Sequence, residues 1–142
     1  GENATAGNSF AGLVRDVGRD RQQAIDAIRA GFSATLLKDA GIYLDVPANR
    51  IRAVVRLPET TAQTLLKRGA SMDAATSERL WRLADVMSMA KDVFEDVEAA
   101  KAWLRTGNLT FCGAAPMDYL DTEPGAMTVR QVLNAIATGG SL

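Results

Sequence analysis

The most regular pattern in the chain is a stripe of apolar residues between positions 73 and 94. Its members recur at alternating spacings of three and four residues, which predicts a helix with one face in a core. They are Leu80, Leu83, Met87, Ala90 and Phe94. Asp73 is expected to cap the start of this helix. Shorter helical patterns cover 10–30, 32–41, 97–105 and 123–137, and strand-like alternation persists nowhere. The predicted fold is therefore all-α, with Gly18 and Gly31 dividing the N-terminal helices and Gly41 ending the helix that follows.

Two short helices are predicted on either side of Leu57-Pro58, because a proline disfavours helical geometry at the residue before it. They cover 47–56 and 59–68, the spacing of a helix-turn-helix. Arg50 and Arg52 of the first helix are expected on phosphates. The second helix should present an outward face of hydroxyl, amide and cationic groups, which suit phosphates and base edges. That face comprises Thr60, Thr61, Gln63, Thr64, Lys67 and Arg68, and the inward face comprises Ala62, Leu65 and Leu66.

The C-terminal third carries several helix start and stop signals. Asp96 is expected to cap a helix over 97–105, and Gly107 to follow it in the left-handed conformation that favours glycine. After a loop, Pro116 should open a one-turn helix. Thr122 should cap the last helix, so this region is predicted to consist of three helices joined by tight turns.

Composition restricts the class of protein. The 142 residues, 47% of them hydrophobic, suit one ordinary domain or two small ones. No apolar run approaches the roughly 18 residues of a membrane span, and the first ten residues lack a signal-peptide pattern. The single cysteine, Cys112, cannot form an internal disulfide. We therefore expect a cytoplasmic protein without membrane contact, with Cys112 half-buried in a loop.

Three acids close together, Asp118, Asp121 and Glu123, raise the question of catalysis. They could form an acid/base set, a metal site or the ends of helices. Histidine is absent, which excludes a Ser-His-Asp triad and a histidine-based zinc site within the chain. The 12-residue calcium loop with its final glutamate is also missing. Helix termini explain the acids more simply, and we expect no enzymatic activity, no metal and no cofactor.

Charge is unevenly distributed along the chain. Residues 50–68 carry five cations and one acid, whereas residues 92–123 carry seven acids and two cations. Such asymmetry indicates two different partners, although clusters of this size can also be ordinary solvated surfaces.

The C-terminal residues 77–140 resemble the C-terminal domain of the Xre/MbcA/ParS antitoxin family. The resemblance is carried by several ordered stretches: "SERLWRL", "VFEDVEAAKAWL", "TGN", "PMDYLDTEPGA" and the helix from Val129 to Gly139. Residues 31–70 resemble the Xre-like helix-turn-helix DNA-binding domain of this family. The resemblance divides the chain into an N-terminal segment, 1–30, the helix-turn-helix, 31–70, and a toxin-binding and dimerisation domain, 71–142.

The resemblance implies an antitoxin of a bacterial type II system. Such a protein binds a RES-domain toxin that degrades NAD⁺, covers its active site, and represses its own operon by binding operator DNA. It implies a homodimer joined through the C-terminal domain, assembled with toxin into a hetero-oligomer. The rival hypothesis is a DNA-binding regulator without a toxin partner.

Candidate toxin contacts follow from the same resemblance, with the region 112–142 expected over the NAD⁺-binding cleft. Aromatic residues are typical interface anchors, and an acid can pair with the toxin's cations; Trp103 could equally be core. The expected contacts are Trp103, Asp118, Tyr119, Thr138, Gly139, Gly140 and Leu142. The chain departs from the family in two places. Arg56 occupies the turn position where glycine is common, and Ala115 replaces the threonine that caps the one-turn helix.

Overall fold

The structure is a computed structural model that describes residues 9–139. It is all-α, as predicted: these residues contain no β-strand, only an isolated antiparallel bridge between Ser33 and Ser71. The helices are α2 (Phe10–Asp16), α3 (Arg21–Ala30), α4 (Thr35–Leu44), α5 (Ala48–Val55), α6 (Glu59–Arg68), α7 (Ala74–Phe94), α8 (Val97–Arg105) and α9 (Glu123–Ala137), with 3-10 turns η1 (Leu109–Phe111) and η2 (Pro116–Tyr119).

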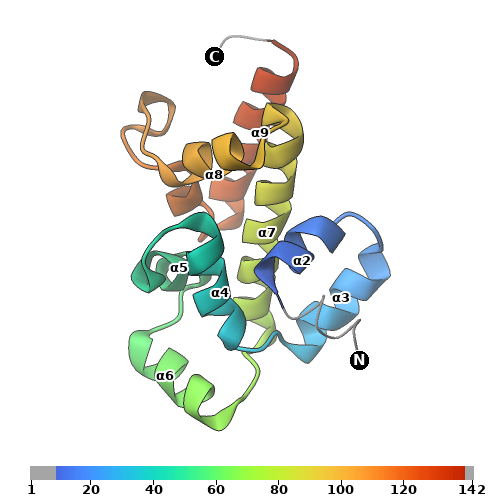
Figure 1. The fold of residues 1–142 in the computed structure, drawn as a ribbon, viewed down its shortest axis with the longest axis vertical. Helices are drawn as coiled ribbons and strands as arrows, with labels where there is room; N and C mark the ends of the chain where they lie inside the picture. The colour runs from blue at the N-terminus through green and yellow to red at the C-terminus, as the bar shows by residue number, and fades with distance from the viewer. Residues whose placement is uncertain (1–8, 140–142) are drawn as a thin grey trace.

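Helix α7 is the axis of the molecule, and α2, α3, α5, α8 and α9 pack around it (Figure 1). The predicted stripe explains this role, because Leu80, Leu83, Met87 and Ala90 are fully buried. The N-terminal helices belong to the same core. Phe10 is buried, and its ring lies 5.3 Å from that of Tyr43 on α4. Among the described residues, one hydrophobic core thus extends from Phe10 to Leu133.

Side chains satisfy the first backbone amides of the three helices for which the sequence predicts a cap. The Asp73 carboxylate accepts the Thr76 amide at 2.8 Å, and Asp96 accepts the Glu98 amide at 2.9 Å. The Thr122 hydroxyl accepts the Gly125 amide at 3.1 Å. The hydrogen bond from the Thr76 amide lowers the pKa of Asp73, because it stabilises the ionised carboxylate.

Two glycine predictions were wrong, both because a close approach to a carbonyl in the following turn or loop decides the position. Helix α4 runs through Gly41 to Leu44 and ends at Asp45, whose φ is +59°. A Cβ at Gly41 would lie 3.1 Å from the Val46 carbonyl oxygen, so glycine permits close packing there. Gly107 is not among the positive-φ glycines of the described residues. Its Cβ would lie 2.3 Å from the carbonyl oxygen of Gly113, so the two ends of the 107–113 loop can meet only without a side chain.

Two burial predictions were also wrong. Leu66 is 43% exposed rather than inward, because α6 stands away from the core and buries only Ala62. Cys112 is exposed rather than half-buried, on a backbone whose φ is +56°.

Candidate functional site

Helix α6 lies at one end of the molecule, separate from the helices around α7 (Figure 1). Its six predicted outward residues, Thr60, Thr61, Gln63, Thr64, Lys67 and Arg68, are all exposed. Within the helix, the Thr64 hydroxyl donates to the Thr60 carbonyl at 3.0 Å, and the Gln63 amide to Glu59 at 3.4 Å. The face therefore presents hydroxyls, an amide and two cations on a regular helix, a combination that suits base edges and phosphates.

The turn that sets the angle between α5 and α6 is built around Arg56. Its φ of +59° is left-handed, which explains why glycine is common at this turn position and costs roughly 1–2 kcal/mol for a residue with a Cβ. The Leu57 amide donates to the Arg52 carbonyl at 3.0 Å, which closes α5. Arg79 of α7 donates to the Val55 carbonyl at 3.3 Å, so the turn is held from the central helix.

Arg50 and Arg52, both expected on phosphates, lie in different surroundings. Arg52 is half-buried on α5. The Arg50 guanidinium donates to the Arg105 carbonyl at 3.1 Å and to the Asp118 carboxylate at 3.5 Å. Arg50 is thus directed toward the C-terminal helices and is not grouped with the α6 residues.

The contacts of Arg50 belong to a seam between α4–α5 and the C-terminal helices. Arg105 of α8 donates to the Leu44 carbonyl at the end of α4, at 3.2 Å. The Lys101 ammonium lies 4.2 Å from the centre of the Tyr43 ring, within cation–π range. Burial, and then the charge of Glu98, raise the pKa of Tyr43. The two parts of the molecule are therefore fixed against each other by several polar contacts.

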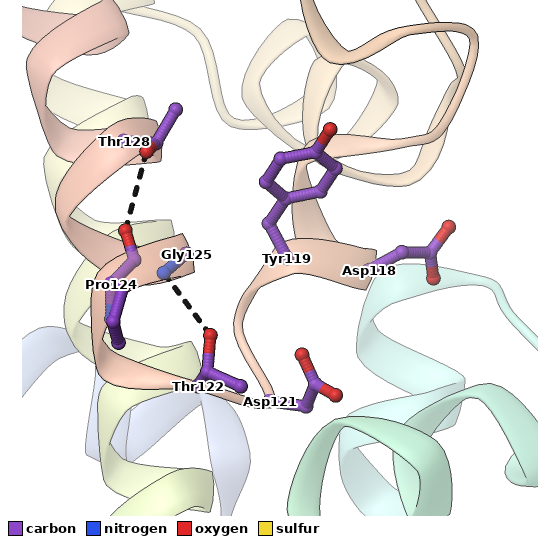
Figure 2. A pocket seen from close by; sticks show the side chains of 7 residues that line it. All are labelled: Asp118, Tyr119, Asp121, Thr122, Pro124, Gly125 and Thr128. Atoms are coloured by element: carbon purple, nitrogen blue, oxygen red, sulfur yellow. Dashed lines mark hydrogen bonds between the residues drawn. The ribbon is translucent and has the colours of Figure 1, made fainter.

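A shallow hollow of about 380 Å³ lies between η2 and the start of α9 (Figure 2). Its walls carry carboxylates on one side and hydroxyls on the other, from Asp118, Tyr119, Asp121, Thr122, Pro124, Gly125 and Thr128. Gly125 is required for its shape, since a Cβ there would lie 1.9 Å from the Tyr119 carbonyl oxygen. The hollow suits a cationic or hydrogen-bonding side chain of a partner.

The three clustered acids do not act on one point. Asp118 pairs with Arg50, Glu123 pairs with Arg82 at 3.4 Å, and Asp121 lines the hollow. In residues 9–139 no three His, Cys, Asp or Glu side chains lie close enough to hold a metal ion. The arrangement thus offers a surface for recognition rather than a convergent acid/base set.

Sequence reasoning missed Arg82, which fixes the geometry of this region. Arg82 is buried on α7, and its guanidinium donates twice to the Leu120 carbonyl, at 3.0 and 2.8 Å. The segment between η2 and α9 is thereby tied to the central helix. The available signal was a cation next to Leu83 within the apolar stripe, which requires a polar partner if the helix is surrounded.

Trp103 is part of a chain of aromatic rings under the C-terminal surface. Its ring centre lies 5.7 Å from that of Phe94 and 6.0 Å from that of Phe111, and Phe111 lies 5.1 Å from Tyr119. Trp103 and Tyr119 remain half-exposed. The Tyr119 hydroxyl donates to the Phe111 carbonyl at 3.2 Å, so that both aromatic candidates support the 107–115 loop as well as reaching the surface.

The last predicted contacts lie at the end of α9. Thr138 is exposed, and Gly139 has a φ of +72°. Gly140 and Leu142 lie outside the described residues. Ala115 gives η2 no side-chain cap, as predicted from the missing threonine.

Comparisons with known proteins match one family domain to the α6 region and another to the region of the hollow and α9. Residues 89–139 match the family described as the Antitoxin Xre/MbcA/ParS C-terminal toxin-binding domain, and residues 23–85 match the Antitoxin Xre-like helix-turn-helix domain. The Antitoxin Xre of Pseudomonas putida is 32% identical over 118 residues, which cover 81% of this chain and 71% of the relative. The chain belongs to the Xre antitoxin family. The Antitoxin Xre of Yersinia enterocolitica is 25% identical over 116 residues, 81% of this chain and 78% of that protein.

The two matched domains of this Xre antitoxin each contain one of the surfaces described above. Helix α6 falls within the matched helix-turn-helix, and the hollow, the aromatic rings around Phe111 and all of α9 fall within the matched toxin-binding domain. The seam residues Arg50 and Arg105 join the two. No helix of the described chain is long and apolar enough to cross a membrane.

Proposed function

We propose that this antitoxin binds and covers the active site of a RES-domain toxin that degrades NAD⁺, and that it represses its own operon in the cytosol. The observation that supports the proposal most strongly is the separation of two surfaces. A neutral-to-basic helix face lies at the α6 end, and a hollow with two carboxylates lies within the domain matched as toxin-binding.

Toxin inhibition is proposed to occur by steric exclusion. An NAD⁺-degrading site must carry cations or hydrogen-bond donors for the phosphates of NAD⁺. Asp118 and Asp121 can pair with such groups, while Tyr119 and Trp103 supply rigid contact area. Thr138, Gly139, Gly140 and Leu142 extend the contact beyond the hollow. The antitoxin then needs no catalytic group of its own, because it acts by occupying the substrate's place.

Operator binding is proposed to place α6 in the major groove. Thr60, Thr61, Gln63 and Thr64 would face base edges, while Lys67, Arg68 and Arg52 would contact phosphates. The phosphate role of Arg50 stays a prediction, because its guanidinium contacts Asp118 and the Arg105 carbonyl. Two-fold operators require two such helices, and we propose a homodimer joined through the C-terminal domain.

Co-expression tests both parts of the proposal in cells. The neighbouring gene is proposed to encode the RES-domain toxin. Expressed alone, its product should lower cellular NAD⁺ and stop growth, and this chain should restore both. A promoter fusion of the same operon should be repressed by the chain. Repression without rescue would indicate a DNA-binding regulator that has no toxin partner, and would contradict the antitoxin mechanism.

A further inference from the structure

One apolar side chain in the toxin-binding domain is almost completely in water. Leu109, the first residue of η1, is 93% exposed. The other large exposed apolar residues within 89–139 are Val97 and Met127, at 37% and 52%. Single exposed leucines are common, so exposure alone carries no function. The loop that carries Leu109 is held in one conformation by hydrogen bonds and by Phe111 beneath it.

The loop from 107 to 115 is held by its own hydrogen bonds. The Asn108 amide donates to the Ala114 carbonyl at 3.1 Å, and the Gly113 amide donates back to the Asn108 carbonyl at 2.9 Å. The turn passes through Cys112 at a φ of +56°, an unfavourable conformation for a residue with a Cβ. Cys112 is the C-cap of η1, so this residue and the two hydrogen bonds hold the backbone around Leu109 in one conformation.

Phe111 anchors the same loop from beneath. Its side chain is 1% exposed and packs against the rings of Trp103 and Tyr119, and its carbonyl accepts the Tyr119 hydroxyl at 3.2 Å. Phe111 fills the interior position under the turn, while Leu109 projects two residues earlier. The loop is therefore a fixed support that presents Leu109 outward, and Figure 1 shows it extending from the molecule between α8 and the segment before α9.

The surroundings of Leu109 indicate the chemistry of its partner. The stretch from Thr106 to Met117 contains no charged residue. The acidic hollow begins directly after it, and Tyr119 belongs to both, since it lines the hollow and holds the Phe111 carbonyl. An apolar projection next to an acidic hollow fits a partner surface with an apolar pocket beside a cation.

We propose that Leu109 is an anchor that inserts into an apolar pocket of the toxin. The inference rests on the proposed function and adds a specific contact outside the hollow and the terminal helix. The toxin is the chosen occupant because Leu109 lies within the residues matched as a toxin-binding domain. Because hydrogen bonds already hold the loop backbone, binding does not have to order that backbone.

The test compares two exposed apolar residues. Leu109→Asp, Leu109→Met and the control Ile42→Asp are purified as full chains, and binding to an inactivated RES-domain toxin is measured by calorimetry. Ile42 is 70% exposed on α4, outside the toxin-binding domain. Leu109→Asp should weaken binding at least roughly tenfold, as for an interface anchor. Leu109→Met and Ile42→Asp should bind like the unmodified chain, and all should keep the same melting temperature.

Each other outcome contradicts the proposal in a distinct way. If the unmodified chain does not bind the toxin, the proposed function fails and Leu109 loses its partner. If the unmodified chain and Leu109→Asp bind equally well, the anchor alone is rejected. If Leu109→Asp changes the mass of the free antitoxin in light scattering and leaves toxin affinity unchanged, Leu109 is a contact between copies. Should Leu109→Asp lower the melting temperature, Leu109→Ala decides the same question, with unchanged affinity rejecting the anchor.

Discussion

The two ends of this antitoxin display their surfaces in different ways. At the helix-turn-helix end, one regular helix, α6, presents six of the eight candidate residues and buries only Ala62. At the toxin-binding end, the surface depends on distant contacts: Arg82 holds the Leu120 carbonyl, and Gly125 allows η2 to meet α9. The comparison teaches that substitutions at the first end should alter recognition locally, whereas substitutions at the second end should alter the surface and the fold together.

The largest effect is expected from Gly125→Ala. The new Cβ would lie 1.9 Å from the Tyr119 carbonyl oxygen, so η2 and α9 must separate, at a cost of about 3 kcal/mol in unfolding free energy. Toxin affinity should fall together with stability. Denaturant unfolding measures the stability, and calorimetry measures the toxin affinity. Gly18→Ala is the matched control, because nothing lies within 4 Å of its added Cβ. Equal stability of the two variants would contradict the packing described for the hollow.

Removing both cations at the end of α6 should weaken DNA binding alone. The double variant Lys67→Gln, Arg68→Gln is expected to lose about 2 kcal/mol of operator affinity, roughly 30-fold. The slope of log binding constant against log salt concentration should become less steep by about two, because two phosphate contacts are lost. Operator titrations at several salt concentrations measure both quantities, and toxin affinity serves as the control. An unchanged salt slope would mean that DNA docks elsewhere.

Asp73→Ala should lower stability by about 1 kcal/mol at neutral pH, through loss of the cap of α7. The carboxylate accepts the Thr76 amide, which lowers its pKa below the usual 3.8. Its contribution is therefore complete above about pH 4 and disappears as the pH falls through the lowered pKa. Unfolding curves at neutral and acid pH should show the difference between variant and parent shrinking on acidification. A difference independent of pH would assign the effect to packing rather than to the cap.

The smallest effect is expected at the seam. Arg50→Gln removes the guanidinium that donates to the Arg105 carbonyl and to the Asp118 carboxylate. The loss should lower the unfolding free energy by about 0.5–1 kcal/mol. Salt-dependent operator titration then separates the two roles considered for Arg50. A slope equal to that of the parent indicates a seam residue, whereas a slope reduced by about one indicates a phosphate contact.

The comparison also explains what could be predicted from the sequence. The caps Asp73, Asp96 and Thr122 were predicted correctly, because each depends on neighbours within a few residues. Arg82 and Arg105 were missed, because their acceptors lie 38 and 61 residues away in the sequence. Gly41 was misread as a helix end, and Gly107 was placed correctly after α8 but in the wrong backbone conformation. In both cases a close approach to the Val46 or Gly113 carbonyl decides the position.

The surface residues divide along the same line. The exposed face of α6 followed from helical periodicity, although the narrow contact of that helix left Leu66 more exposed than expected. The exposure of Leu109 could not be predicted, because an apolar residue beside Phe111 in a short loop has no periodicity to assign it inward or outward. Its position became apparent only with the hydrogen bonds of the 107–115 loop.

The central claim is that the toxin-binding end covers the active site of an NAD⁺-degrading toxin. The most direct measurement is NAD⁺ degradation by the purified RES-domain toxin during titration with the purified chain. Turnover should fall to zero once the toxin is saturated. Gly125→Ala should shift the titration to higher concentrations, whereas the double variant Lys67→Gln, Arg68→Gln should not. Full turnover by toxin that is saturated with the chain would contradict the claim.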